Sequence, residues 1–166
     1  MRRPAALSLL SVLTLAACAH EAGDGERRGA YGGMDWVLSQ AEGYESKLAY
    51  GVPDTDNVAV MLSCQPKSDQ VSVVLVGVEG GARPVLTLGS GRTLTRLPAT
   101  RVQGMDAFDV EATAPARSRP LTRFAETGEL TVGVGARRTE MPPADPAKSR
   151  KFVESCRGER QARLGK

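Results

Sequence analysis

Cysteine and histidine are the residues best suited to nucleophilic, acid–base or metal chemistry, and both are scarce in this chain. Its 166 residues include three cysteines, which are Cys18, Cys64 and Cys156. The single histidine is His20. A catalytic cysteine needs a base that lowers its pKa, and most protein zinc sites combine cysteine and histidine at short spacing. Because no histidine follows His20, we expect no cysteine nucleophile, no metal site and no cofactor in the folded part of the chain.

The carboxylates are the next candidates. The run Asp54-Thr55-Asp56-Asn57 is the densest acidic cluster, and its oxygens are ligands that calcium accepts. It lacks the glycine at position six and the final glutamate of a calcium-binding loop, so we interpret it as a turn capped by acidic side chains. Glycoside hydrolysis needs two carboxylates across a cleft, and no spacing in the sequence indicates such a pair among Glu42, Glu45, Asp106 and Asp109. We therefore expect that the protein is not an enzyme.

The N-terminus carries an export signal. Arg2 and Arg3 precede an apolar stretch of eleven residues, Ala5 to Leu15, which has signal-peptide length and is too short to span a bilayer. The stretch ends in Leu15-Ala16-Ala17-Cys18. This run resembles a lipobox, the motif at which bacterial lipoprotein signals are cleaved after the cysteine receives a diacylglyceryl group. The alternative is an ordinary secretory signal that happens to precede a cysteine, and both interpretations predict export.

The resemblance to lipoproteins implies an anchor at Cys18 and a location in the cell envelope. Removal of residues 1–17 would leave Cys18 with two or three acyl chains, which hold a protein stably on a membrane where a single chain does not. Asp after the lipidated cysteine favours inner-membrane retention in Gram-negative lipoproteins, and here the residue is Ala19, which implies the outer membrane facing the periplasm. Residues 18–33 are poor in apolar side chains, which predicts a flexible tether.

The predicted export also bears on whether the other two cysteines form a disulfide. Cys64 and Cys156 form an even pair in a protein sent to an oxidising compartment, where disulfides form and persist. We predict a Cys64–Cys156 disulfide. In the chain-entropy model, a disulfide that closes a loop as long as the one between these two cysteines stabilises the fold by about 4 to 5 kcal/mol.

The charge distribution contains one basic segment. Without Arg2 and Arg3, 20 basic and 19 acidic side chains remain, so the exported chain is nearly neutral. Residues 147–166 hold seven basic and two acidic side chains. If a helix continued through them, Arg157, Arg160 and Arg163 would form a stripe facing anionic lipid or cell-wall groups; a solvated, frayed end is the favoured alternative. The compartment excludes nucleic acid as a partner.

The candidate side chains of the domain must be positioned by short strands that turn residues separate. The expected strands are Trp36–Ser39, Lys47–Val52, Asn57–Cys64, Val71–Val78, Pro84–Leu88, Thr93–Leu97, Met105–Ala112 and Leu130–Val134. Val71–Val78 is apolar at nearly every position, which predicts a central strand buried on both faces. Gly89-Ser90-Gly91 predicts the tight connection of a hairpin. About eight short strands favour a mainly β fold, an antiparallel sandwich or a small barrel.

Two short helices are expected to interrupt the strands. Pro120, Leu121, Phe124 and Ala125 have helical spacing, and Gly128 is a typical helix terminator. A second helix, at the C-terminus, should begin at Asp145-Pro146, because Asp caps helices and proline suits the first helical position. We therefore predict one domain over residues 34–157 and a basic tail over residues 158–166.

One further resemblance concerns function. The stretch from Leu62-Ser63-Cys64 through Val71-Ser72-Val73-Val74 resembles the membrane-bound lysozyme inhibitors, small periplasmic barrels that plug a lysozyme cleft. That family carries a Ser-Gly-x-Arg-Tyr segment, whereas the nearest run here, Gly89 to Thr93, has no tyrosine. The likeness also leaves the two helices and Cys156 unexplained.

Three functions remain open at this point. We prefer a non-catalytic binding or assembly module of the envelope, presented by the tether to a protein or cell-wall partner. The first alternative is an inhibitor of a secreted hydrolase such as lysozyme, and the second is an enzyme that uses only carboxylates and hydroxyls.

Overall fold

The computed structural model describes residues 33–78, 81–104 and 108–158. The predicted signal peptide, Cys18, His20 and nearly all of the tether lie outside the described residues, as do residues 159–166 of the basic tail. In the described part of the chain, the elements in order are β1 (Asp35–Ser39), β2 (Ser46–Gly51), β3 (Val58–Cys64), β4 (Gln70–Leu75), β5 (Val85–Ser90), β6 (Thr93–Pro98), β7 (Thr100–Gln103), β8 (Phe108–Pro115), α1 (Arg119–Thr127), β9 (Thr131–Val134), β10 (Thr139–Glu140) and α2 (Pro146–Cys156).

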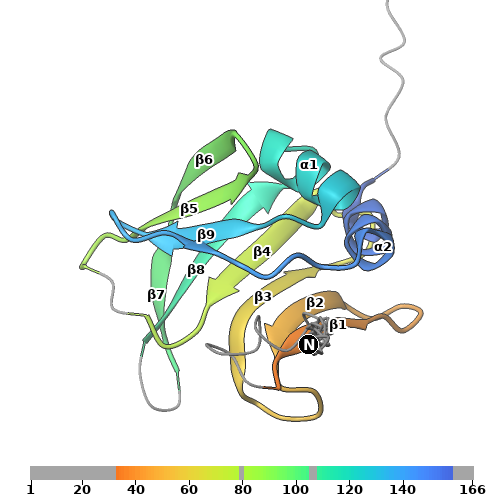
Figure 1. The fold of residues 1–166 in the computed structure, drawn as a ribbon, viewed down its shortest axis with the longest axis horizontal. Helices are drawn as coiled ribbons and strands as arrows, with labels where there is room; N and C mark the ends of the chain where they lie inside the picture. Colours follow the sequence, from red (N-terminus) through yellow and green to blue (C-terminus); the bar gives the residue numbers. More distant parts are fainter. Residues whose placement is uncertain (1–32, 79–80, 105–107, 159–166) are drawn as a thin grey trace, which may run out of the picture. The chain divides into compact units, whose positions relative to one another are not determined.

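The strands form two antiparallel sheets that make a sandwich rather than a closed barrel (Figure 1). One sheet has the order β1-β2-β3-β4-β8-β7, and the other has the order β10-β9-β5-β6. Only Ala99 separates β6 from β7, so one extended segment pairs first with β5 and then with β8. A strand that passes from one sheet to the other makes a corner of the sandwich. The expectation of a mainly β sandwich with two short helices is confirmed.

The core lies on the inner face of the larger sheet. The strand register aligns a buried row across four strands, made of Leu48, Leu62, Val73 and Ala112. β4 is central, as predicted, but its burial alternates: Val73 is buried, while Ser72 and Val74 are half-buried. The prediction that both of its faces are buried was wrong, because α2 covers only the inner face, where Cys64 lies.

Three strand details differ from the expectation. β7 was not predicted, because all four of its side chains are exposed and carry no apolar alternation. β10 has only two residues, too few for any periodicity. In the β5–β6 hairpin, Ser90 pairs with Thr93, so the turn is Gly91-Arg92 rather than Gly89-Ser90-Gly91. Local glycine spacing indicated the hairpin, but only the pairing register decided which residues turn.

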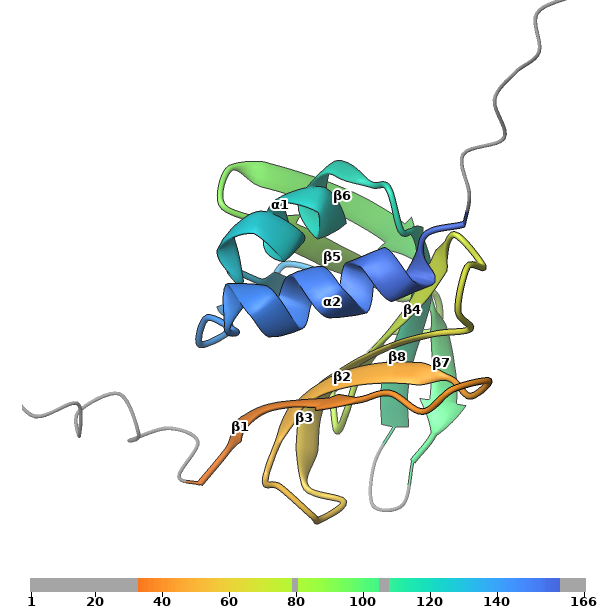
Figure 2. The same cartoon turned by 90° about the vertical axis from the view of Figure 1, so that its right-hand side faces the viewer.

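One end of each helix lies where a local signal predicted it. α1 ends at Gly128, which has a φ of 71° and donates its N–H to the carbonyl oxygen of Phe124. At the start of α2, the carboxylate of Asp145 accepts a hydrogen bond of 2.7 Å from the N–H of Ala147. Figure 2 shows the two helices side by side, with α1 against the β5–β6 hairpin and α2 above β2.

Aromatic side chains tie β1 to the helices. The ring of Trp36 lies 5.4 Å from that of Tyr50 and 5.8 Å from that of Phe124, measured between centroids. Its indole Nε1 donates a hydrogen bond of 2.7 Å to the carbonyl oxygen of Pro142, in the segment before α2. The apolar surface of the indole packs against these rings, and its single N–H donor is hydrogen-bonded. The cluster therefore joins β1 and β2 to the two helices.

Candidate functional site

The two cysteines of the fold are joined. A disulfide links Cys64, the last residue of β3, to Cys156, the last residue of α2, with a Cα–Cα distance of 5.6 Å. Both residues are buried. The bond attaches the C-terminal helix to the inner face of the sheet, so neither sulfur is available as a thiol nucleophile.

The acidic run at residues 54–57 forms the turn between β2 and β3. The hydroxyl of Thr55 donates to the carbonyl oxygen of Val52 at 2.9 Å and accepts from the N–H of Asn57 at 3.2 Å. The turn is therefore capped by a threonine hydroxyl, and the expectation of capping by the aspartates needs this correction. Among the described residues, no group of three or more His, Cys, Asp and Glu side chains is arranged to hold a metal ion.

The candidate carboxylates have structural partners. Asp109 accepts a hydrogen bond of 3.0 Å from the N–H of Gly77. Glu45 lies 3.1 Å from the Lys47 ammonium, and a hydrogen bond from the Ser63 hydroxyl is the main cause that lowers the pKa of its carboxyl group. Asp106 lies outside the described residues, and Glu42 is exposed in the β1–β2 connection. No spacing in the sequence indicated a pair among these four groups, and those that the structure describes are not paired.

A second serine also meets a carboxylate. The Ser72 hydroxyl on β4 donates a hydrogen bond of 2.7 Å to Glu111 on β8. The pair lies on the outer face of a sheet between two hydrogen-bonded strands, whose amides are used by the ladder. Acyl transfer also requires donors aimed at a developing oxyanion, and a regular ladder supplies none. We interpret this pair as a cross-strand contact.

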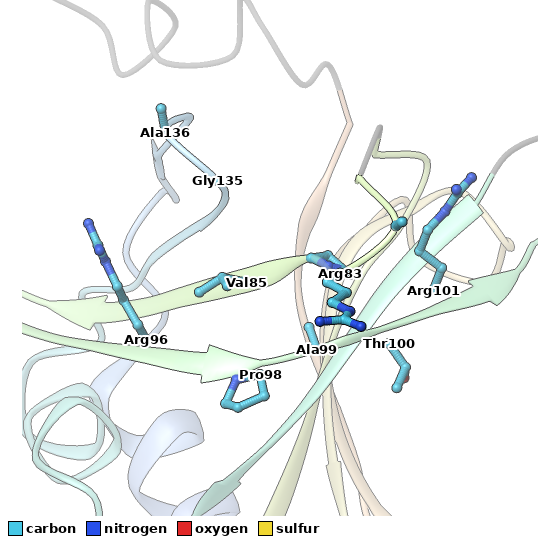
Figure 3. Close-up of a pocket in the computed structure, with 11 residues that line it drawn as sticks. Arg83, Val85, Arg96, Pro98, Ala99, Thr100, Arg101, Gly135 and Ala136 are labelled. Atoms are coloured by element: carbon cyan, nitrogen blue, oxygen red, sulfur yellow. The ribbon is translucent and has the colours of Figure 1, made fainter.

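A groove opens where the β6–β7 segment leaves β5. Up to Pro98 this segment pairs with β5, and the N–H of Ala99 makes a last bond to the carbonyl oxygen of Pro84; beyond it, β7 pairs with β8 instead. The groove has a volume of about 1190 Å³ (Figure 3). Its lining residues are Ala82, Arg83, Pro84, Val85, Arg96, Pro98, Ala99, Thr100, Arg101, Gly135 and Ala136.

Three arginines are the charged residues of this lining, and we call the site the arginine groove. Arg83 precedes β5, Arg96 lies on β6 and Arg101 lies on β7, and all three are exposed. The guanidinium of Arg101 stacks 3.7 Å from the ring centre of Phe108. Within the described part of the chain, none of the three arginines has a carboxylate partner, and no acidic residue lines the groove. The remaining walls are mostly alanine, proline and valine.

The sequence had placed its only basic patch elsewhere. Arg157 would begin a basic stripe only if the helix continued, but α2 ends at Cys156 and Arg157 is extended. Its guanidinium donates to the carbonyl oxygen of Ala116 and to the hydroxyl of Thr122, which makes it a structural residue. Arg160 and Arg163 lie outside the described residues. The arginine groove was missed because its three charges lie on different elements, before β5, on β6 and on β7, and never form a run in the sequence.

The run Gly89 to Thr93, which carries part of the likeness to lysozyme inhibitors, forms the tip of the β5–β6 hairpin, at the opposite end of these strands from the arginine groove. Arg92 is exposed there. No helix within the described ranges is long and apolar enough to cross a membrane. Comparison with known proteins finds no family that matches the chain, no similar curated protein and no matching solved structure.

Proposed function

We propose that this chain is a lipid-anchored, non-catalytic binding module of the cell envelope, and that the arginine groove takes an anionic ligand. The observation that carries the proposal is the set of three exposed guanidinium groups, Arg83, Arg96 and Arg101, around an apolar groove that no acidic residue of the described ranges lines. Arginine binds carboxylate and phosphate groups with two parallel hydrogen bonds, so an anion of either kind would satisfy these donors.

Two features of the groove favour the binding of an anionic ligand over a set of arginines that are merely exposed to solvent. Arg101 is held against the Phe108 ring, which limits the side-chain freedom that binding would otherwise remove. The walls formed by Pro84, Val85 and Pro98 are apolar, so a ligand that covers them excludes water and strengthens each ionic contact. An anionic group next to an apolar portion fits this combination.

The location is proposed from the N-terminal motif. Lipidation at Cys18 would attach the chain to the membrane, and the tether over residues 18–33 would let the domain reach a protein or cell-wall partner. Ala19 supports the outer membrane, periplasmic face. The inhibitor of a secreted hydrolase stays the alternative, and it would use the hairpin tip at Arg92, at the far end of β5 and β6.

Binding of simple anions to the full-length chain tests the proposal. We would titrate the protein with pyrophosphate, citrate and a short-chain phosphatidylglycerol below its micelle concentration, and follow backbone amide shifts. We expect saturable shifts at the residues of the arginine groove that weaken with salt. Charge reversal by Arg83→Glu with Arg96→Glu should weaken binding by about tenfold or more.

Arg92→Glu is the matched control, because it reverses one exposed charge at the hairpin tip without touching the groove. It should bind the anions as the parent chain does. The absence of saturable groove shifts with every anion, or equal binding by the Arg83→Glu, Arg96→Glu chain, would overturn the proposal. Capture of lysozyme that is lost only in Arg92→Glu would support the inhibitor alternative.

A further inference from the structure

We infer that the ligand of the arginine groove is an extended acidic peptide of another envelope protein, which pairs as an added strand with the free edge of β7. The inference rests on the proposed function and narrows its anionic ligand to a polypeptide. It depends on the position of β7, on the contrast between the two edges of the larger sheet, and on the spacing of the arginines.

The free edge of β7 borders the arginine groove. Among the described strands, β7 is the last of its sheet and pairs only with β8, from Thr100 opposite Glu111 to Gln103 opposite Phe108. Thr100 and Arg101 line the groove, and the segment at residues 82–85 forms another part of its wall. An exposed edge carries unpaired N–H and C=O groups in a regular row, which an extended peptide can complete.

The opposite edge of the same sheet, β1, is closed by side chains. The N–H of Trp36 donates to the Asp35 carboxylate at 2.7 Å, and its carbonyl oxygen accepts a hydrogen bond of 2.8 Å from Lys148 on α2. Among the described residues, no side chain makes such a bond to the backbone of Thr100–Gln103. Proteins commonly block edges that must not pair, so the open edge at β7 is suited to a partner strand.

The arginines are spread along the groove instead of converging on one point. Arg96 lies where the β6–β7 segment pairs with β5, Arg101 lies where it pairs with β8, and Arg83 approaches from the lead into β5 (Figure 3). Side chains on one face of an added strand repeat about every 7 Å. Carboxylates repeated along an extended peptide can therefore meet more than one of these guanidinium groups, while the peptide backbone lies along the edge of β7.

The test uses the acetylated, amidated peptide Val-Glu-Val-Glu-Val-Glu and the full-length chain. In a strand, the N–H groups of alternate residues point to opposite edges, so N-methylation of the three Val residues or of the three Glu residues blocks one edge only. We expect one of these two methylated peptides to lose affinity by about tenfold or more and the other to bind nearly as the parent does. Hydrogen exchange at Thr100–Gln103 should slow when the parent peptide binds.

Charge variants complete the test. Arg83→Glu with Arg101→Glu should weaken peptide binding by about tenfold, and Arg92→Glu should leave it unchanged. Equal affinity of both methylated peptides, or no change in exchange at β7, would overturn strand addition. If pyrophosphate or anionic vesicles bind the groove and the peptide does not, strand addition is wrong while the anion site stands. If no anion binds, the proposed function fails as well.

Discussion

Lys148 on α2 donates a hydrogen bond of 2.8 Å to the carbonyl oxygen of Trp36 on β1, so a helix near the C-terminus closes the edge of the strand that begins the domain. The same ammonium lies 4.0 Å from the Asp35 carboxylate. The contact connects two parts of the chain that are 112 residues apart. The Lys148–Trp36 contact blocks the β1 edge of the larger sheet, whereas the edge at β7 is open.

Removing the Lys148 ammonium should expose this edge. Lys148→Met keeps the aliphatic stem but leaves the Trp36 carbonyl without its donor, so we expect the free energy of unfolding to fall by about 1 kcal/mol. The protein should also associate more readily at high concentration. Thermal unfolding and sedimentation velocity measure both effects. Lys151→Met, an exposed neighbour on α2, is the control and should behave as the parent.

The disulfide should contribute more than any single contact. Replacing Cys64 and Cys156 together with alanine removes a cross-link across 92 residues, so the free energy of unfolding should fall by about 4 to 5 kcal/mol in the chain-entropy model. Urea unfolding of the double variant and of the parent chain with and without reductant measures the loss. An unchanged urea midpoint would show that the bond does not stabilise the fold.

Gly128 should be intolerant of any side chain. Its φ of 71° is in the left-handed region, and an added Cβ would collide with the backbone carbonyl of Ala144. We expect Gly128→Ala to lower the free energy of unfolding by about 2 to 4 kcal/mol. Gly43 has a similar φ of 79° with nothing near its Cβ position, so Gly43→Ala should cost about 1 kcal/mol. Equal losses in the two variants would contradict the collision.

Glu45 should contribute stability that depends on pH. Hydrogen bonding from Ser63, with the charge and hydrogen bond of Lys47, lowers its pKa in the folded state. A lowered pKa means that the contribution is present above the ordinary pKa of glutamate and is lost as the pH falls through the lowered value. Ser63→Ala should raise the pKa of Glu45 toward the ordinary value, as measured by carboxyl NMR titration.

The pH dependence of unfolding supplies the second measurement. The part of the Ser63→Ala stability loss that comes from ionised Glu45 should be present at about pH 7 and absent at about pH 2. Lys47→Met should shift the same titration in the same direction. A Glu45 titration that is identical in the parent and in Ser63→Ala would contradict the assignment.

The anchor is tested at Cys18. Cys18→Ser should abolish acyl labelling and leave the protein unprocessed or released into the periplasm, because the thiol is the group that receives the lipid. Ala19→Asp should keep the lipid but move the protein to the inner-membrane fraction. Unchanged labelling and fractionation of Cys18→Ser would overturn the lipoprotein interpretation.

Local patterns in the sequence were sufficient for much of the fold. The Asp145-Pro146 start of α2 and the Gly128 end of α1 were predicted because helix caps depend on residues within one turn of each other. Alternation likewise placed Val60, Leu62 and Cys64 on one buried face of β3. The Cys64–Cys156 pair followed from counting cysteines in a chain with a predicted export signal.

Only the tertiary structure decided where the arginine groove lies. Arg83, Arg96 and Arg101 come together because β6 continues past Ala99 into the second sheet, and that crossing depends on which strands pair. The periodicity within a strand does not indicate which distant strand it pairs with. The exposed strand β7 also has no apolar pattern at all. Residue types and local spacing therefore determined most of the elements and the disulfide of this protein, while its candidate binding site arises from contacts that no single segment encodes.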